Sequence, residues 1–442
     1  MPARLALGGD RDDLSLLVRL LLVGDPVALD DARRLLPVDD MTRLLTVRGA
    51  EVSCPFEVAP HAEDGADWWV VSDRTDRLGR PTRPDHVLGV GGASTTLAQL
   101  TVRRPVGAAL DIGTGCGVQA LHLSRHAATV TATDSVPRAL ELAATGFALS
   151  GVDVELVHGN LADPVTDRTF DLVVCNPPFV VGPSARFAYR DAGRAGDAMS
   201  RDAVRAAASV LADGGVAQLL VNWLHVGGED WRDRVAEWVG DLGGDAWLIE
   251  RDLQDPVDYV STWLSDAGER DDSLAEEWLR WFAASRVEAI GFGWVVLRRG
   301  AAPHRVGVES AAQPMDQPLG PHVGAWLDRV EWLRGRSDED LLAARLLVAP
   351  QALRDVSSAP GSDGWATAGQ ALRLDEGFRW ALPCDDATAA IVGGCDGRTP
   401  LRSVVAVLSA VLGEPEAELA PAVCATVRGL VDRGLLLPTP EG

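Results

Sequence analysis

The fold of this chain is decided by the stretch Asp111-Ile112-Gly113-Thr114-Gly115-Cys116-Gly117, which joins an apolar run to an amphipathic one. The run at 108–112 predicts a buried strand, and residues 118–126 predict a helix. The glycines between them permit a tight turn and let a ligand approach the backbone. The free N–H groups and the dipole at the helix start favour an electron-rich group. The stretch therefore predicts a ligand-binding strand-turn-helix unit.

Strand and helix patterns alternate beyond this turn. Further strands are predicted at 129–133, 154–158, 170–175 and 216–222, and helices at 137–150 and 202–211. Alternation of this kind predicts an α/β fold of the Rossmann-like, doubly wound class, with a parallel sheet covered by helices on both faces. Ligands in such folds bind at the carboxyl ends of the strands.

The length of 442 residues exceeds one ordinary core and predicts several domains. Residues 1–85 predict an N-terminal helical or winged-helix-like cap, because helix patterns precede short strand patterns. Residues 86–300 hold the alternating α/β domain. Residues 301–370 predict a linker with a partly helical segment, and residues 371–442 predict a C-terminal winged-helix-like module.

The charge balance is acidic throughout, with 64 acidic residues against 41 arginines, no lysine and a net charge of -23. Residues 1–85 carry 11 arginines against 16 acids, residues 86–300 carry 18 against 29, and residues 301–442 carry 12 against 19. A protein that binds naked nucleic acid normally presents a basic face, so this balance counts against that class.

Other sequence features predict a cytoplasmic protein without a metal. There is no apolar run long enough for a transmembrane helix and no signal-peptide pattern, so no membrane association is expected. The six cysteines show neither a disulfide framework nor a zinc spacing. His122 and His126 lie four residues apart on a predicted helix without a third ligand, and we interpret them as surface histidines.

An acid follows the second predicted strand. Asp134 lies 23 residues after Asp111, and an acid about 20 residues beyond a Gly-rich turn can accept hydrogen bonds from both hydroxyls of a ribose. Asp134 and Ser135 also precede Pro137, so a helix-capping role is the alternative. The two roles are compatible with each other.

The most specific pattern is Asn176-Pro177-Pro178-Phe179, directly after the strand predicted at 170–175. The side-chain oxygen of Asn176 and the carbonyl of Pro177 can accept both N–H bonds of a planar amine or amide. The fixed φ of the two prolines would hold these acceptors rigid, and Phe179 offers a stacking face. An ordinary Asn-Pro turn that closes a strand is the alternative.

Together these motifs resemble the class I S-adenosylmethionine-dependent methyltransferases of the small-domain type, over about residues 105–225. Residues 111–117 are similar to their motif I, and residues 176–179 to the (D/N/S)PP(Y/F) motif of enzymes that methylate glutamine N5, guanine N2 or adenine N6. The resemblance implies that 86–300 is the catalytic domain and that S-adenosylmethionine is the cofactor. The implied cofactor-binding residues are Asp111, Gly113, Thr114, Gly115, Gly117, Asp134, Ser135, Asn160, Leu161 and Asn176, and the implied catalytic residues are Asn176, Pro177, Pro178 and Phe179.

The resemblance implies methyl transfer to a planar nitrogen, either a protein glutamine amide or the exocyclic amine of an RNA base. The acidic balance favours a protein substrate, or RNA inside a larger particle. One alternative is a small-molecule methyltransferase of a biosynthetic pathway. Another is a winged-helix regulator that binds nucleic acid and uses S-adenosylmethionine as an effector, and a NAD(P) oxidoreductase is a more distant one. The sequence gives no oligomeric state.

Each of two further segments allows two interpretations. The Gly-rich residues 85–96 predict either a lid over the cofactor or an interdomain linker. A run of arginines after the Asn-Pro-Pro-Phe motif predicts either contacts to an acidic substrate or pairing with local acids. The arginines are Arg186, Arg190, Arg194, Arg201 and Arg205, and the local acids are Asp191, Asp197 and Asp202.

Overall fold

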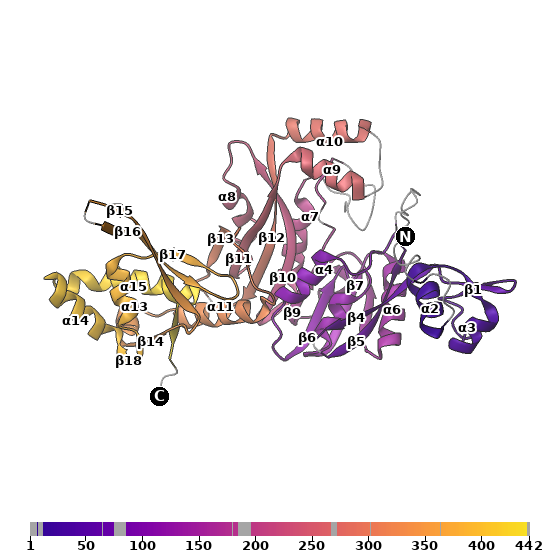
Figure 1. The fold of residues 1–442 in the computed structure, drawn as a ribbon, viewed down its shortest axis with the longest axis horizontal. Coiled ribbons are helices and arrows are strands. Elements are labelled where there is room, and N and C mark those ends of the chain that lie inside the picture. The colour runs from indigo at the N-terminus through magenta and orange to yellow at the C-terminus, as the bar shows by residue number, and fades with distance from the viewer. Residues whose placement is uncertain are drawn as a thin grey trace. The chain divides into compact units, whose positions relative to one another are not determined.

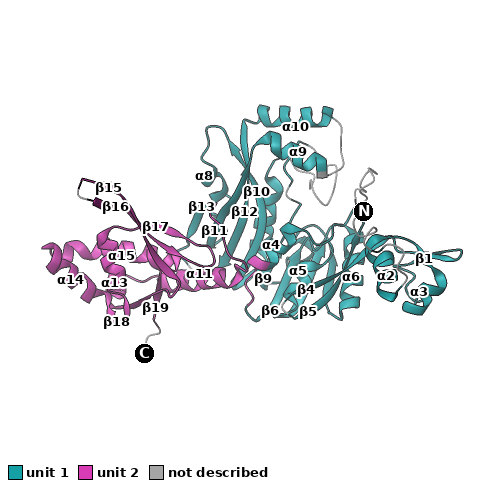
Figure 2. Cartoon of the chain, viewed as in Figure 1, with its two compact units in different colours: residues 1–98, 104–310 teal, residues 99–103, 311–442 magenta. Residues whose placement is uncertain are grey.

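A computed structural model describes residues 7, 12–63, 65–74, 85–178, 180–183, 196–266, 272–300, 302–362 and 364–439. The chain forms two compact units (Figure 2). Unit 1 comprises residues 1–98 and 104–310, and unit 2 comprises residues 99–103 and 311–442. Within these described ranges, no helix combines the length and the apolar character needed to cross a membrane.

Unit 1 is built on an eight-stranded sheet in the order β13-β11-β12-β10-β9-β6-β7-β8 (Figure 1). The strands are β6 (Val106–Ile112), β7 (Ala127–Asp134), β8 (Glu155–His158), β9 (Phe170–Cys175), β10 (Leu211–Val226), β11 (Gly244–Gln254), β12 (Val287–Arg299) and β13 (Val306–Ser310). Strands β6 to β10 are parallel to their neighbours among themselves. This part of the sheet confirms the predicted Rossmann-like core.

The sheet is mixed, however, and not wholly parallel as predicted. Strand β12 runs antiparallel to both β10 and β11, and β13 is parallel to β11. A strand that is buried on both faces reads as a continuous apolar run whatever its direction. The hydrophobic pattern therefore carries no information about the direction of β12.

Helices cover both faces of the sheet, as predicted. The helices after the N-terminal part are α4 (Gly92–Leu100), of which residues 99 and 100 belong to unit 2, and α5 (Val118–Leu123), α6 (Pro137–Ser150), α7 (Ala198–Ser209), α8 (Trp231–Ala236), α9 (Pro256–Asp266) and α10 (Asp272–Ala284) of unit 1. Side chains of α7 and α8 pack with Leu110 and Ile112 of β6 in one core cluster. Because side chains alternate along a strand, Asp111 points to the opposite face, where it accepts a hydrogen bond from the N–H of Ala120 in α5.

The order of the strands creates a crevice between β6 and β9. From β6 the chain builds outward through β7 and β8 on one side, and it then returns to form β9 and β10 on the other. Such a reversal leaves the carboxyl ends of the two central strands uncovered, which is where α/β sheets bind ligands. The turn after β6 and the Asn176 motif after β9 therefore lie side by side.

The N-terminal part of unit 1 has helices followed by strands, in the predicted order. It comprises α2 (Asp13–Leu17), the π-helix η1 (Val18–Val23), β1 (Val27–Ala28), α3 (Leu29–Leu35), β2 (Thr46–Arg48), β3 (Glu51–Ser53), β4 (Phe56–Glu63) and β5 (Ala66–Asp73). Strands β1, β3 and β2 form a small sheet, and β4 pairs with β5. The hairpin packs on α6, where a Cβ added to Gly146 would lie 3.0 Å from the carbonyl oxygen of Trp69. The winged-helix identity of this part stays a prediction.

Unit 2 has a core of its own. Its helices are α11 (Gly320–Leu333), α12 (Asp338–Ala343), α13 (Asp386–Gly393), α14 (Leu401–Leu412) and α15 (Glu416–Arg433). Its strands are β14 (Arg345–Val348), β15 (Ala352–Gly361), β16 (Gly364–Leu374), β17 (Ala381–Pro383), β18 (Asp396–Pro400) and β19 (Leu436–Pro438). The apolar faces of α12 to α15 enclose one cluster that includes Leu341, Leu408 and Val427.

The segment 301–370, predicted as a linker with a partly helical segment, contains two helices and also strands. It holds β13, α11, α12, β14 and most of the β15–β16 hairpin. Most of this hairpin is exposed on both faces, so its sequence shows no alternation of apolar and polar residues. The winged-helix identity of the C-terminal module stays a prediction.

Candidate functional site

A cavity of about 330 Å³ lies at the carboxyl ends of β6, β7, β8 and β9. The predicted motifs and the implied residues Asn160 and Leu161 meet at this cavity, because parallel strands bring their carboxyl ends to one edge of the sheet. Asp111 and Gly117 do not line it, and Phe179 falls outside the described residues. The predicted residues that line it are Gly113, Thr114, Gly115, Asp134, Ser135, Asn160, Leu161, Asn176, Pro177 and Pro178.

The Gly-rich turn uses its glycines in two ways. Gly113 and Gly115 have φ of 71° and 56°, and a Cβ added to either would meet nothing within 4 Å. Both positions therefore leave room for a ligand beside the backbone. Gly117 has φ of 86°, and its Cβ would lie 2.7 Å from the ring of Phe147 in α6. Glycine is required at position 117 because the start of α5 packs closely against α6.

Asp111 maintains the shape of the turn from beneath. Its side chain is 1% exposed and accepts hydrogen bonds from the Thr114 hydroxyl at 2.6 Å and from the N–H of Ala120 at 3.2 Å. Burial raises the pKa of Asp111 to about 7. Thr114 lines the cavity, so its hydrogen bond to Asp111 fixes a residue of the cavity wall.

Asp134 ties the end of β7 to the Gly-rich turn. Its Oδ2 accepts from the N–H of Gly115 at 2.9 Å, and its Oδ1 accepts from the N–H of Val136 at 2.8 Å, just before α6. The contact at the helix start is the predicted alternative, and the same residue also lines the cavity. Burial raises the pKa of Asp134. Ser135 beside it is exposed.

Asn160 and Leu161 form the turn after β8. Asn160 is exposed, and its Nδ2 donates to Asp163 at 3.3 Å. Leu161 has φ of 49°, a left-handed conformation that costs energy for a residue with a Cβ. Its carbonyl accepts from the Thr133 hydroxyl at 2.8 Å, which secures this conformation. Leu161 lines the cavity, so this backbone strain lies at the cavity wall.

Asn176 presents a hydrogen-bond acceptor that no described group uses. Its Oδ1 is buried and has no hydrogen-bond partner. An unsatisfied buried oxygen is costly, and natural proteins tolerate few such atoms except where a ligand completes them. Pro177 and Pro178 continue the cavity wall. Cys175, directly before, is fully buried, and this burial raises its pKa well above the ordinary value, so it is a packing residue.

The cavity also has walls outside the strand-end motifs. Residues 86–89 and 91–94 line it, which favours the lid interpretation of the Gly-rich segment over the linker. Gln119 of α5 secures this segment by donating from Nε2 to the carbonyl of Ser94 at 2.7 Å. Met199 and Trp263 come from distant elements, and no local pattern marks them.

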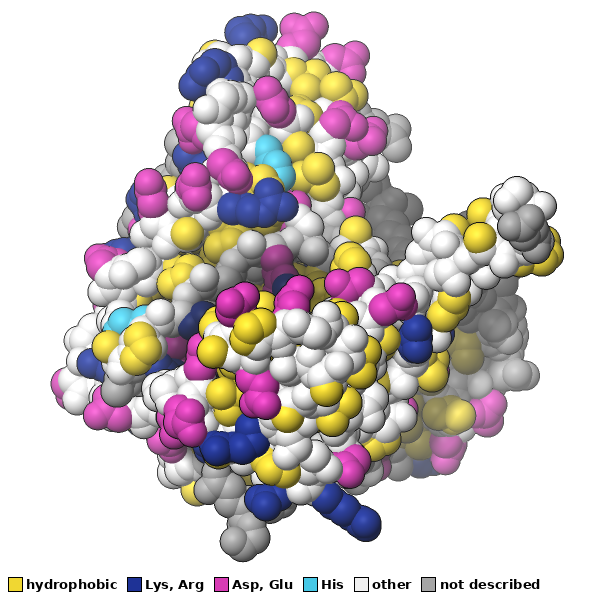
Figure 3. Space-filling view, turned by 90° about the vertical axis from the view of Figure 1, so that its left-hand side faces the viewer, with side chains coloured by type: hydrophobic (Ala, Val, Ile, Leu, Met, Phe, Trp, Pro, Cys, Tyr) yellow, Lys and Arg dark blue, Asp and Glu magenta, His cyan; other side chains and the backbone are white. Residues whose placement is uncertain are grey.

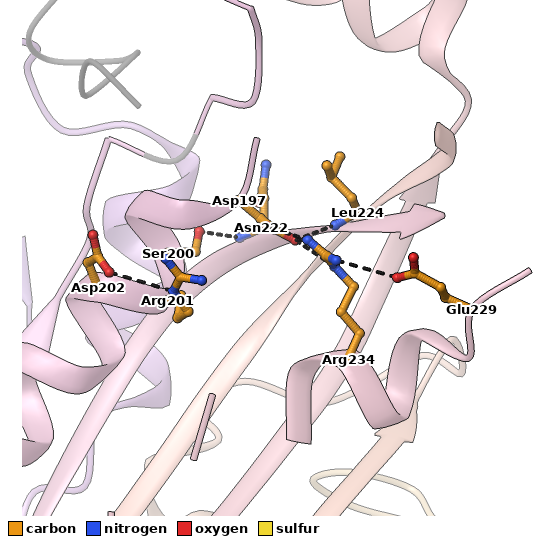
Figure 4. Close-up of polar contacts among 8 residues, drawn as sticks. All are labelled: Asp197, Ser200, Arg201, Asp202, Asn222, Leu224, Glu229 and Arg234. Carbon is orange, nitrogen blue, oxygen red and sulfur yellow. Dashed lines mark hydrogen bonds and ion pairs between the residues drawn. The ribbon is translucent and has the colours of Figure 1, made fainter. Parts of the chain in front are cut away.

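A polar cluster anchors the start of α7 (Figure 4). Asp197 is buried and accepts from Arg234 of α8 at 2.8 Å and from the N–H of Leu224 at 3.1 Å. The hydroxyl of Ser200 accepts from the N–H of Asn222 at 3.2 Å. The start of α7 is therefore attached to the last residues of β10. This part of α7 carries Met199, which lines the cavity.

The arginine run pairs with acids where it is described. Arg201 lies 3.6 Å from Asp202, and Arg205 makes two hydrogen bonds to Asp241 at 2.8 and 2.7 Å. These pairs follow the second of the two interpretations, although Asp241 was not the predicted acid. Arg186, Arg190, Arg194 and Asp191 lie outside the described residues.

His122 is 5% exposed, so the prediction of a surface histidine was wrong. The β4–β5 hairpin covers it, a tertiary contact that the helix pattern does not reveal. Its Nε2 lies 3.0 Å from Nε2 of His61, and its Nδ1 lies 3.1 Å from Glu63. The three side chains place ligand atoms within 4.8 Å of one another. A hydrogen-bond chain from His61 through His122 to Glu63 satisfies the same atoms, and we assign no metal to them.

Comparisons with known proteins point in one direction. A family model described as methyltransferase small domain matches residues 89–227, and one described as a domain of unknown function matches residues 324–438. The chain is 34% identical over 234 residues to the release factor glutamine methyltransferase of Deinococcus radiodurans. The aligned region covers 46% of this chain and 81% of that protein.

Other similarities are shorter or more distant. The chain is 31% identical over 147 residues to the ribosomal RNA small subunit methyltransferase C of Cronobacter sakazakii, covering 32% of this chain and 41% of that protein. It spans 26% of the release factor glutamine methyltransferase of Geobacter sulfurreducens. A solved T. thermophilus 16S rRNA methyltransferase, bound to AdoMet and guanosine, shares 16% identity over 62% of this chain and 65% of its own, with a TM-score of 0.31.

Proposed function

This chain belongs to the small-domain family of S-adenosylmethionine-dependent methyltransferases, and from that premise we propose that it methylates a planar nitrogen of a protein substrate. The leading acceptor is the side-chain amide of glutamine. The observation that carries the proposal is the buried Oδ1 of Asn176 at the cavity wall, a hydrogen-bond acceptor with no partner among the residues that the structure describes. A primary amide or amine supplies the N–H group that this oxygen lacks.

Asn176 and Pro177 act on the acceptor nitrogen. The Oδ1 of Asn176 and the carbonyl of Pro177 accept its two N–H bonds, which fixes the direction of the nitrogen. Both oxygens also stabilise the positive charge that grows on this nitrogen as it reacts. When bound, S-adenosylmethionine supplies a methyl group activated by its sulfonium. The nitrogen held by Asn176 and Pro177 would take this methyl group as the sulfur–carbon bond of the donor breaks, and it would release one proton to water.

The remaining lining residues fit the donor. Open space beside Gly113 and Gly115 suits a ligand that lies against the backbone, and we assign the methionyl part to this turn together with Thr114. Asp134 is assigned to the ribose hydroxyls. Asn160, Leu161 and Ser135 are assigned to the adenosine part. Asp111 and Gly117 support this site through the contacts to Thr114 and Phe147.

Charge favours a protein acceptor over RNA. The chain carries a net charge of -23, and the arginines in Figure 3 are interspersed with acids over the face in view. A phosphate backbone would be repelled by such a surface, unless the RNA lay within a particle that supplies basic protein. The relative that the chain covers at 81% is named as a glutamine methyltransferase.

Six cysteines without a disulfide suit a reducing compartment, and we propose a cytoplasmic location.

The test is transfer of a radiolabelled methyl group from S-adenosylmethionine into a cell extract that is then separated into protein, RNA and small-molecule fractions. We expect label in the protein fraction, absent with Asn176→Ala. Digestion of the labelled protein to amino acids then shows whether the label is N5-methylglutamine. Label confined to RNA or to small molecules would reject a protein acceptor, and equal labelling by Asn176→Ala would reject the mechanism.

A further inference from the structure

Two helices replace the turn between the antiparallel strands β11 and β12. α9 follows directly after β11 and α10 directly precedes β12, while Gln254 and Ile290 are paired across the two strands. Figure 1 shows α9 and α10 beyond the end of these strands. This edge of the sheet is the one that carries Asn176, because β10 ends there and runs parallel to β9. We call α9 and α10 together the helical insertion.

The helical insertion holds the chain that follows the Asn-Pro-Pro motif. The N–H of Val181 donates to the hydroxyl oxygen of Tyr259 at 2.7 Å, and Tyr259 is completely buried. A Cβ added to Gly182 would lie 2.9 Å from the ring of Trp278, so the backbone passes directly against this indole. Residues 180–182, the acceptor segment, therefore take their position from α9 and α10.

The face of α9 that holds the acceptor segment also reaches the cavity. Trp263 lies four residues after Tyr259, hence one helical turn further along the same face. The two rings are 6.0 Å apart between centroids and inclined by 57°. Trp263 lines the cavity together with Asn176, Pro178 and Met199. Among the described lining residues it is the sole tryptophan, tyrosine or phenylalanine.

We propose that Trp263 contacts the methyl acceptor and determines its specificity, and that Tyr259 is a positioning residue for the acceptor segment. The inference rests on the proposed function, since it concerns the acceptor side of the same cavity. A planar amide or base packs favourably against an indole face. The indole also limits the rotation of the acceptor, so that its nitrogen stays directed toward Asn176.

The test for Trp263 measures acceptor and donor separately. The acceptor is the extract fraction that the wild type labels, assayed as a dilution series with labelled S-adenosylmethionine. For Trp263→Ala we expect the half-saturating amount of acceptor to rise about tenfold. Trp263→Phe should stay close to the wild type, because it keeps an aromatic face. Calorimetry with S-adenosylhomocysteine should give an unchanged Kd for both variants.

Tyr259→Phe tests the positioning role. It keeps the ring and removes the oxygen that accepts from Val181, so we expect kcat to fall about fivefold or more while the Kd for S-adenosylhomocysteine stays unchanged. The matched control for Trp263→Ala is Trp365→Ala on β16, which removes an indole that is 77% exposed and far along the sequence from the cavity residues. Thermal unfolding of each variant checks that it folds.

The outcomes separate the two proposals. If the wild type labels a fraction and Trp263→Ala saturates like the wild type, the role of Trp263 is rejected while the methyltransferase function stands. Loss of S-adenosylhomocysteine binding in Trp263→Ala would place the indole on the donor side and also reject the inference. If the wild type labels no fraction at all, both the acceptor proposal and the role of Trp263 are rejected.

Discussion

The backbone N–H of Gly115 donates a 2.9 Å hydrogen bond to Oδ2 of Asp134 and so joins the turn after β6 to the end of β7. This one contact connects two sequence motifs that are separated by α5. A carboxylate that is ionised accepts such a bond more strongly than a neutral oxygen does. The shape of the Gly-rich turn and the position proposed for the ribose therefore depend on each other.

Replacing Asp134 by Ala should weaken donor binding. The variant loses the proposed contact to the ribose and releases the N–H of Gly115, and hydrogen bonds to a charged group are worth about 1.5–3 kcal/mol. We expect the Kd for S-adenosylhomocysteine to rise about 10- to 100-fold in calorimetry. Asp153→Ala, which removes an exposed acid near β8, serves as the control. An unchanged Kd for Asp134→Ala would rule out its assignment to the donor.

Replacing Gly117 by Ala should destabilise the fold. Its φ of 86° is unfavourable for alanine, and the added Cβ would collide with Phe147 at 2.7 Å. We expect the free energy of unfolding to fall by about 2–4 kcal/mol. The matched variant is Gly151→Ala, where φ is 65° but nothing lies within 4 Å of the added Cβ. Urea unfolding should show a smaller loss for Gly151→Ala, and equal losses would mean that the collision is relieved without cost.

Replacing Arg234 by Met should affect the acceptor side of the cavity. It leaves the buried carboxylate of Asp197 with its contact to the N–H of Leu224 but without its arginine, which costs about 3 kcal/mol in a buried pair. We expect a lower free energy of unfolding and a lower kcat, because the start of α7 and Met199 lose their anchor. The control is Arg205→Met, whose pair with Asp241 is solvent-exposed and worth less than about 1 kcal/mol. Similar losses in both variants would contradict the anchoring role.

Burial of Asp111 should make stability depend on pH. Its pKa of about 7 in the folded state lies above the ordinary value of 3.8, so between these limits the folded state retains a proton that the unfolded state has lost. The stabilisation of the folded state by the protonated Asp111 is complete below pH 3.8 and disappears as pH rises through 7. We therefore expect the Tm of the wild type to fall more than that of Asp111→Asn as pH rises across this window. Parallel curves, measured by calorimetry without cofactor, would show that the pKa of Asp111 is not raised.

The sequence predicted the parts of the site that depend on local pattern. The bounds of β9 and α6 agree with the predicted 170–175 and 137–150, because apolar runs and proline at a helix start act within a few residues. The convergence of Gly115, Asp134 and Asn176 also follows from local pattern, since each follows a parallel strand. A rule of topology then brings all three to one edge of the sheet.

The rest was decided by contacts between distant segments. No periodicity distinguishes the antiparallel β12 from a parallel strand, because both faces of it are buried. The burial of His122 depends on the β4–β5 hairpin, whose His61 lies 61 residues earlier in the chain. No local pattern marks Trp263 as a residue of the site, and only the packing of α9 on the acceptor segment brings its ring to the cavity. The sequence by itself therefore determined the residues at the strand ends, including the proposed donor contacts and Asn176, because they follow local rules. Only the tertiary structure decided the remaining wall on the proposed acceptor side, including Trp263, because packing between elements far apart in the chain assembles it.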